Sequence, residues 1–550
     1  MTGPHIFGQT PDKHITLKIN ARNSIDSLVL KTIEYQTKFK ENQEVLKELE
    51  SLKNELQRLG HLDNTYNLVK TNDSLFSATF RLQKHYPIIY LKIQKNKNVQ
   101  DYISQTGLVI RNDSIKIETA FAKAYLKKLS AIASNNGNPF AKFQITNITK
   151  DTNQNLKADL KYLPGTKRTI NNINIQGYTN APKNFLKYSV GIKEGAVFNR
   201  KELNEQSNRL SNLPFIHQTK PPEVLFTTDS TTIYLYLERR TTNKFDGFLG
   251  FSSEDNNNLR LNGYLDLTLV NNFNYGESFV LNYKADGGDQ SQLSIYTQLP
   301  YLFKTPLGIE ASLNLFRKDS TFSTTKQTLN LLYQRNQRNS YSIGYETEQS
   351  ENLSTNTQTQ LRDYTTTRLR ASFKHEQLSS QLFFPLKRRL YLQASAGNRQ
   401  VANEKERQIS LTAIIENEFD LYNKHSLYLK NTSNYLLSNN LLTNELFRFG
   451  GILSMRGFEE NSILANFFNT LNSEYRYKLT NNLYINSILD FGYFENDVNN
   501  TKQKLYSFGL GTGVQTKTGI LKLNLANGIF ENDDFRFSNI KLHVILEVRF

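Results

Sequence analysis

The second half of the chain, from about residue 246 to residue 550, alternates hydrophobic and polar positions with the period of two that is typical of β-strands. Three segments show this most clearly, with aliphatic side chains on one face and charged, amide or hydroxyl side chains on the other: 259–269, 307–315 and 542–550. Turn residues separate strands at Asn271-Asn272, Gly287-Gly288, Asn481-Asn482 and Asn499-Asn500. About 300 residues at roughly 19 per strand and turn predict roughly sixteen strands.

A strand count of this size favours a transmembrane antiparallel β-barrel with a polar lumen at residues 246–550. Closure of the sheet gives every backbone group a partner inside the lipid and leaves no edge for aggregation. A soluble β-domain, which would carry its polar face on the outside, is the alternative.

Before residue 240 the hydrophobic period changes, and a unit of strand, helical region and two strands occurs three times. We assign these units to residues 13–87, 88–166 and 167–240. The predicted fold class is therefore a series of α+β repeats followed by a transmembrane antiparallel β-barrel of roughly sixteen strands.

Each unit has its own hydrophobic pattern. In the first, five hydrophobic positions spaced four and three apart predict a helix over Val45–Leu59, which Gly60 ends. The second unit has helical spacing from Ile117 to Ile132. In the third we expect two helices and then two strands, at 182–190, 201–213, 224–227 and 232–238.

Overall hydropathy does not by itself reveal a membrane protein. Hydrophobic residues make up 38% of the chain and the mean hydropathy is −0.55. No run of about 18 apolar residues occurs, so a helical membrane protein is excluded. A barrel remains compatible because every second residue of its strands faces the lumen, and 29 tyrosines and 35 phenylalanines are many for so polar a chain.

Charge and cysteine content exclude several classes of protein. The formal net charge is +16, but the basic residues are spread through strands and helices, and we expect no nucleic-acid partner. The absence of cysteine removes disulfides, thiolate metal sites, cysteine nucleophiles and a lipid-modified N-terminal cysteine. This composition is compatible with an oxidising periplasm.

The first residues, 1–12, lack the basic segment and the long apolar core of a complete signal peptide. Our hypothesis is that Ile6-Phe7-Gly8 is the end of a truncated signal that is cleaved before Gln9. A cytoplasmic protein is the alternative, and an apolar segment encoded upstream of Met1 would decide between the two.

No catalytic constellation emerges from the sequence. The eight histidines form no His-Glu-x-x-His arrangement, no Gly-x-Ser-x-Gly elbow occurs, and the glycine-rich segment Phe508–Gly513 lacks the lysine and helix of a phosphate-binding loop. We therefore expect no enzymatic activity, no metal and no cofactor.

The most informative segment is Phe449–Phe458, which ends in Met455-Arg456-Gly457-Phe458. An arginine inside a barrel needs an anionic partner, and its planar guanidinium suits bidentate contact with a carboxylate. Glycine permits a tight bend, and phenylalanine fills a gap in the lumen. The alternative is an extracellular loop with a solvated charge.

In its place before the last strands of a barrel, this segment resembles the outer-membrane assembly superfamily that includes BamA, TamA and the two-partner secretion transporters. In that family an Arg-Gly-Phe tip belongs to a long loop folded back into the lumen. Met455 stands where valine or isoleucine is commoner. The resemblance implies acidic partners on following strands, best matched by Asp490 in Leu489-Asp490-Phe491-Gly492 and less closely by Glu474 in Ser473-Glu474-Tyr475-Arg476.

The three N-terminal units resemble POTRA domains, in which a small three-stranded sheet carries two helices on one face. The local matches are Leu59-Gly60-His61-Leu62, Gly137-Asn138-Pro139-Phe140-Ala141, and Ile192-Lys193-Glu194-Gly195 followed by Leu213-Pro214-Phe215-Ile216. A generic α+β repeat is the alternative. If the resemblance holds, exposed sheet edges accept an extended client segment by strand addition.

The last strand also carries a resemblance. Its final positions, Leu546, Val548 and Phe550, are similar to the C-terminal signal by which outer-membrane proteins are recognised for insertion. The same pattern is that of any barrel strand, so it supports the assignment without deciding it.

Three POTRA-like units before a barrel are closest in layout to TamA. The resemblance implies a bacterial outer-membrane protein with periplasmic N-terminal domains, which captures unfolded outer-membrane or secreted client polypeptides and aids their insertion or export. Expected partners are these clients, the lipid bilayer, and an accessory protein on the periplasmic or inner-membrane side. The alternatives are a two-partner secretion transporter for one dedicated client, which usually has two repeats and a plug helix, and a passive pore or receptor.

Overall fold

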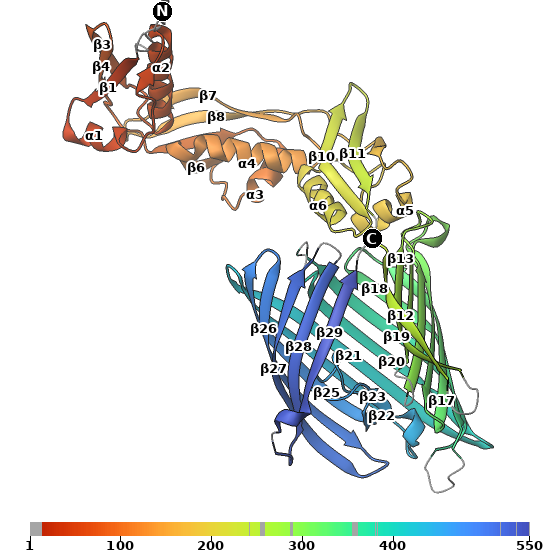
Figure 1. The fold of residues 1–550 in the computed structure, drawn as a ribbon. Coiled ribbons are helices and arrows are strands. Elements are labelled where there is room, and N and C mark those ends of the chain that lie inside the picture. The colour runs from red at the N-terminus through yellow and green to blue at the C-terminus, as the bar shows by residue number, and fades with distance from the viewer. Residues whose placement is uncertain are drawn as a thin grey trace, which may run out of the picture. The chain divides into compact units, whose positions relative to one another are not determined.

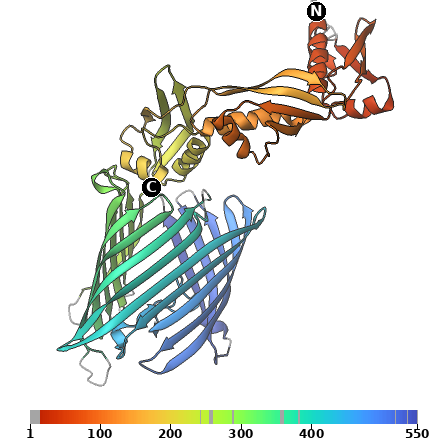
Figure 2. The same cartoon turned by 180° about the vertical axis from the view of Figure 1, so that it is seen from behind.

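The structure is a computed structural model that describes residues 14–240, 242–253, 259–285, 290–354, 361–379, 381, 383–516, 519–534 and 536–548. The expected signal remnant at residues 1–12 and the expected turn Gly287-Gly288 lie outside this part of the chain. Two compact units are present: residues 1–171 with 195–202 and 227–231, and residues 172–194, 203–226 and 232–550. Figures 1 and 2 show their elements from two sides.

The first sheet of the first unit has the strand order β2-β1-β4-β3. Its elements are β1 (Ile15–Ala21), α1 (Ser24–Leu30), β2 (Lys38–Phe39), α2 (Asn42–Arg58), β3 (Thr65–Asn72) and β4 (Leu75–Arg81). Helix α2 occupies the segment predicted from its hydrophobic spacing and buries Val45, Leu49, Leu52 and Leu56. Gly60 follows it with φ +98°, the left-handed conformation in which glycine commonly ends a helix.

The second sheet has the order β6-β5-β8-β7. Its elements are β5 (Ile88–Ile93), α3 (Lys97–Ser104), β6 (Ser114–Glu118), η1 (Thr119–Phe121), α4 (Ala122–Asn135), β7 (Lys142–Lys150) and β8 (Leu156–Leu163). The prediction of one helical pattern from Ile117 was wrong, because Ile117 lies in β6 and is buried in alternation with Ile115. Phe121, the next position of the predicted pattern, is 61% exposed.

The third sheet, most of which belongs to the second unit, has the order β10-β11-β9. Its elements are β9 (Asn172–Gly177), α5 (Lys183–Phe185), η2 (Leu186–Val190), α6 (Arg200–Ser211), β10 (Ile216–Phe226) and β11 (Thr231–Arg239). The strand expected from residue 224 begins eight residues earlier, at Ile216. Pro221 and Pro222 argued against a strand at these positions in the sequence. The strand tolerates them because β10 lies at the edge of its sheet.

The second unit also contains an antiparallel sheet of sixteen strands, which confirms the predicted barrel and its size. Its strands, in sheet order, are β12 (Lys244–Ser253), β13 (Leu259–Val270), β14 (Ser278–Ala285), β15 (Gln290–Leu299), β16 (Leu307–Lys318), β17 (Phe322–Gln334), β18 (Asn339–Asn352), β19 (Tyr364–Leu378), β20 (Leu386–Val401), β21 (Glu404–Tyr422), β22 (His425–Leu437), β25 (Phe467–Thr480), β26 (Leu483–Asn496), β27 (Thr501–Gln515), β28 (Gly519–Phe530) and β29 (Ile540–Val548).

The barrel has an apolar outer face and a polar inner face. On β17, Leu329 and Leu331 are 59% and 51% exposed, whereas Asn330 between them is buried. On β18, Tyr341, Ile343 and Tyr345 are exposed, whereas Ser342 and Glu346 are buried. A soluble β-domain would bury its apolar side chains and expose its polar ones. The outer surface of this barrel therefore faces lipid. Among the described residues, no helix is long and apolar enough to cross a membrane.

Candidate functional site

A long loop, Ser438–Asn466, joins β22 to β25 and folds into the barrel; we call it the lumen loop. It contains η4 (Thr443–Glu445) and a small hairpin, β23 (Phe447–Phe449) and β24 (Ile463–Ala465). Phe449 stacks on Phe468 of β25 with ring centroids 4.4 Å apart. Met455 is fully buried in the same cluster, so the loop packs against the inner wall as ordered core.

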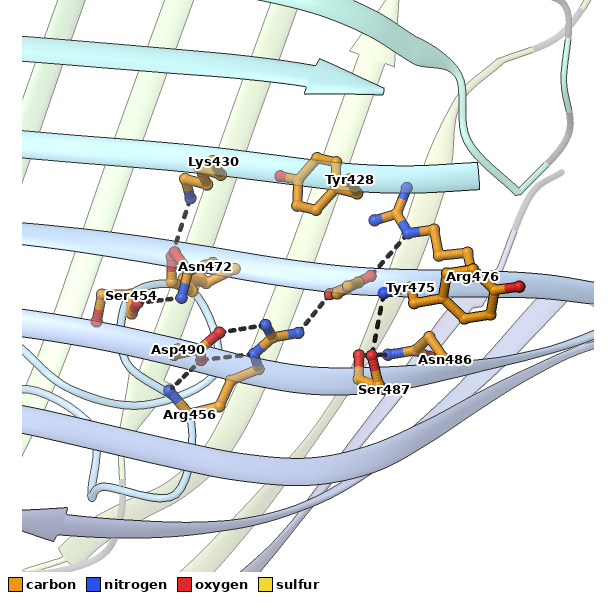
Figure 3. A network of polar contacts seen from close by, with 12 residues as sticks. Tyr428, Lys430, Ser454, Arg456, Asn472, Tyr475, Arg476, Asn486, Ser487 and Asp490 are labelled. Carbon is orange, nitrogen blue, oxygen red and sulfur yellow. Dashed lines mark hydrogen bonds and ion pairs between the residues drawn. The ribbon is translucent and has the colours of Figure 1, made fainter. Parts of the chain in front are cut away.

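The tip of the lumen loop brings Arg456 onto both of its predicted carboxylate partners, as Figure 3 shows for Asp490 of β26. The Arg456 Nε donates to Asp490 Oδ2 at 2.8 Å, its Nη2 donates to Asp490 Oδ1, and its backbone N–H donates to Oδ2 at 3.2 Å. The Arg456 Nη1 contacts Glu474 Oε1 of β25. Arg456 is 4% exposed and Asp490 is completely buried, so the guanidinium meets its charge partners away from bulk water.

The two residues after Arg456 fit the tip against β28. Gly457 has φ +83°, and a Cβ there would lie 2.4 Å from the backbone nitrogen of Gly528. Phe458 in turn occupies the space where a Gly528 side chain would project, and its ring lies 5.2 Å from that of Phe530. The predicted tip Met455–Phe458 therefore contacts strands β25, β26 and β28 through shape as well as charge.

A second attachment of the lumen loop was not predicted. Glu445 forms an ion pair with Arg399 of β20, with Nη1 and Oε1 2.5 Å apart, and accepts from Gln408 of β21 at 2.8 Å. Asn444 donates to Ser350 of β18 at 2.8 Å and to the carbonyl of Arg362 at 2.9 Å. The sequence gives only a slight signal: Leu442–Phe449 combines four apolar residues with four polar ones, Thr443, Asn444, Glu445 and Arg448.

Arg448 extends this second attachment. Its guanidinium carbon lies 4.0 Å from the ring centroid of Phe316 and 5.0 Å from that of Phe322. These rings belong to β16 and β17. Such contacts between a cation and an aromatic face strengthen when water is excluded. The lumen loop is thus held by one group of strands at Asn444–Arg448 and by another at its tip.

The third α/β domain contacts the barrel within the second unit. Tyr188 stacks on Tyr301 of the β15–β16 connection with centroids 5.6 Å apart, and the Phe185 ring meets Tyr301 edge-on at 5.2 Å. Asn271 of the β13–β14 turn donates to the Tyr178 hydroxyl at 3.0 Å. These turns therefore mark the end of the barrel that adjoins the third α/β domain.

The remaining predicted residues lie at the C-terminus. Strand β29 pairs with β28, with Leu546 opposite Leu521 and Val548 opposite Gly519, and Phe550 lies outside the described residues. A role for these three residues in recognition during insertion stays a prediction. Within the described ranges, no cluster of three His, Asp or Glu side chains suited to a metal ion is found.

The lipid-facing barrel, its polar lumen and the small α/β domains define a transmembrane barrel protein of the POTRA-bearing type. Residues 308–516 match the family described as haemolysin secretion/activation protein ShlB/FhaC/HecB. Residues 168–238 match the POTRA family described as surface antigen variable number repeat. No curated protein matches the chain.

Two solved structures share the fold over nearly the whole length. CdiB from Acinetobacter baumannii is 15% identical, with 92% of this chain and 98% of that chain covered and a TM-score of 0.53. CdiB from Escherichia coli is 12% identical, with 92% and 97% covered and a TM-score of 0.54. The resemblance to the outer-membrane assembly superfamily is confirmed, and the protein is an outer-membrane β-barrel with POTRA domains in the periplasm.

Proposed function

We propose that this protein moves client polypeptides into or across the outer membrane and performs no covalent chemistry. The observation that carries the proposal is the lumen loop, which is bound inside the barrel through Arg456 and Glu445. Burying charged pairs costs desolvation that a simple water-filled pore has no need to meet. A loop that is ordered in spite of this desolvation is suited to controlling which polypeptides pass through the barrel or leave it.

Client capture is assigned to the free edge of the third sheet. Strand β9 lies at one end of the order β10-β11-β9, and its side chains Asn172, Asn174 and Gln176 are exposed. The opposite edge, β10, contains Pro221 and Pro222, which have no N–H to donate to an added strand. An extended client segment therefore finds more hydrogen-bonding groups along β9.

Site-specific photo-crosslinking in cells tests this assignment. A crosslinking amino acid at Asn174 should capture client polypeptides, whereas the same group at the exposed position Thr219 on β10 should capture few. Equal capture at both positions would contradict the choice of edge. Ion conductance without crosslinks from either position would favour a passive pore and defeat the transport proposal.

Secretion of one dedicated client is the second candidate. It is favoured by the match of residues 308–516 to a haemolysin secretion/activation family. Three α/β sheets, at 15–81, 88–163 and 172–239, favour the first candidate, because two repeats are usual in two-partner transporters. The identity of the Asn174 crosslinks separates them: several outer-membrane proteins indicate assembly, and a single secreted protein indicates dedicated export.

A further inference from the structure

The connection between β19 and β20 carries two buried phenylalanines, Phe383 and Phe384, and its described residues also include Ser379, Gln381 and Pro385. It is closed by a hydrogen bond from the Ser379 N–H to the Pro385 carbonyl at 2.7 Å. Phe383 and Phe384 are each 5% exposed, whereas Phe303 in the β15–β16 connection is 91% exposed. Because antiparallel strands alternate in direction, both turns lie at the periplasmic end of the barrel.

The two buried rings pack on a distant part of the inner wall. Both meet Tyr484 of β26 edge-on, with centroids 4.9 Å and 4.8 Å apart, and share a cluster with Ile520 of β28. Side chains of β26 alternate between the two faces of the sheet, and Tyr484 is an even number of residues from buried Asp490, whereas Ile485 is exposed. Tyr484 therefore lies on the lumen face with Asp490. Strands β26 and β28 stand four and six positions from β20 in the sheet, so the two rings reach strands that are not neighbours of β20.

Polar and cationic contacts hold the turn in this position. Gln381 accepts from the Lys478 ammonium of β25. The guanidinium carbon of Arg476 lies 4.2 Å from the Phe384 centroid and 4.0 Å from that of Tyr428, so it sits close to both rings. Its Nε donates to Glu474 at 2.7 Å and its Nη1 donates to Glu418 at 3.1 Å.

Arg476 also connects this turn to the tip of the lumen loop. Glu474 accepts from Arg476 through Oε2 and from Arg456 through Oε1. A continuous series of contacts therefore runs from Arg456 through Glu474 and Arg476 to the Phe384 ring, and Figure 3 shows its polar part. Displacing the loop tip leaves Glu474 with one cation fewer and alters the setting of Arg476.

We propose that Phe383 and Phe384 form a gate at the periplasmic end of the lumen, held closed by their contacts with Tyr484 and Ile520, with Arg476 as the positioning residue that links the gate to the lumen loop. Two phenylalanines bury a large apolar area without any covalent bond, which suits a contact that opens and closes. The gate is independent of the client proposed above, because its state is measurable as ion flow through the empty barrel.

Conductance of the full-length protein in planar lipid bilayers tests the gate. Phe383→Ala/Phe384→Ala should raise the open fraction by about tenfold or more over the parent protein, because the closed state loses its ring contacts. Phe303→Ala removes an exposed aromatic from another turn at the same end and should leave conductance unchanged. No rise in the double variant, or an equal rise in Phe303→Ala, would overturn the proposal.

Thiol labelling supplies a second measurement, because the chain has no cysteine of its own. Ile520→Cys places one thiol beneath the gate, and a maleimide should label it slowly in the parent background and at least several-fold faster beside Phe383→Ala/Phe384→Ala. Arg476→Met should accelerate labelling as well, while Arg476→Lys accelerates it less. Retained heat-modifiable migration in SDS gels shows that each barrel is folded. Equal labelling rates in folded variants would contradict the gate.

Discussion

Arg456 and Asp490 are 34 residues apart in the chain and meet inside the barrel through three hydrogen bonds, two from the guanidinium and one from the Arg456 backbone. Because the backbone amide takes part, the carboxylate fixes the course of the loop as well as one side chain. Asp490 is therefore the residue through which β26 determines where the tip of the lumen loop lies.

Removing either partner of this pair should release the loop tip while leaving the barrel assembled. Arg456→Ala and Asp490→Ala each leave buried charge behind, which costs about 3–5 kcal/mol. Arg456→Lys should rescue incompletely, because an ammonium cannot reproduce the planar fork of donors. Protease sensitivity of the lumen loop in the folded barrel is the measurement.

A double-mutant cycle distinguishes direct coupling from general damage. If the pair acts as one unit, the double alanine variant should be little worse than either single variant. Lys502→Ala is the matched control, because Lys502 pairs with Glu495 on the neighbouring strands at 2.9 Å but is 60% exposed. Defects that simply add, or a protected loop in Arg456→Ala, would show that the tip is held by packing alone.

The sequence predicted the barrel well because period-two alternation is a local signal that repeats in every strand. It predicted α2 for a similar reason, since four buried positions lie on one helical face. It misplaced the start of α4, because Ile117 continues the helical spacing by coincidence while its neighbours form a strand. The prolines of β10 suggested a break where an edge strand tolerates them.

The candidate site was predictable only in part. Family resemblance suggested Asp490 and Glu474 as partners of Arg456, and the structure places both beside it. Glu445 and Phe384 could not be foreseen, because their partners, Arg399 and Tyr484, are brought near by the curvature of the sheet and by the course of connections that fold inward. No local pattern in a sequence encodes such a course.

Gly457→Ala should dislodge the loop tip. The new Cβ meets the Gly528 backbone at 2.4 Å, and the φ of +83° is itself unfavourable for alanine by about 1–2 kcal/mol. Gly107→Ala shares a positive φ of +84° but meets no atom within 4 Å, so it carries the strain without the clash and should leave the loop protected. Proteolysis of the lumen loop compares the two, and equal protection would show that the close approach of Gly457 to Gly528 is dispensable.

The first domain should lose stability in mild acid through His61. Burial lowers the pKa of His61 below its ordinary value of 6.5, and charge on His85, stacked at 4.7 Å, lowers that pKa further. The native state therefore favours neutral His61. Its contribution to the free energy of unfolding is complete above pH 6.5 and declines as the pH falls through 6.5 toward the lowered pKa of the native state. Hydrogen exchange of β1 and β4 in the full-length protein should accelerate between about pH 7.5 and about pH 5.5 beyond the intrinsic rate change. His61→Gln should remove this excess, and an unchanged excess would assign the effect to another group.

The second attachment of the lumen loop should respond unequally to its two partners. Arg399 contacts Glu406 as well as Glu445, so Arg399→Met leaves two carboxylates without their guanidinium. Glu445→Gln leaves Arg399 paired with Glu406, and a side-chain amide oxygen still accepts from Gln408. We therefore expect Arg399→Met to lower the temperature of heat-modifiable unfolding more than Glu445→Gln does, since an unpaired buried charge costs more than a weakened hydrogen bond.

Lys387→Ala is the control for this comparison, because Lys387 lies on the same strand and pairs with Asp420, whose side chain is 63% exposed. Its unfolding temperature should match that of the parent protein. Both Arg399→Met and Glu445→Gln should also expose Leu442–Phe449 to protease while the tip, still bound to Asp490, stays protected. If Glu445→Gln lowered the unfolding temperature as much as Arg399→Met does, the charge of Glu445 alone would hold the loop. The ion pair between Arg399 and Glu406 would then contribute nothing to the attachment.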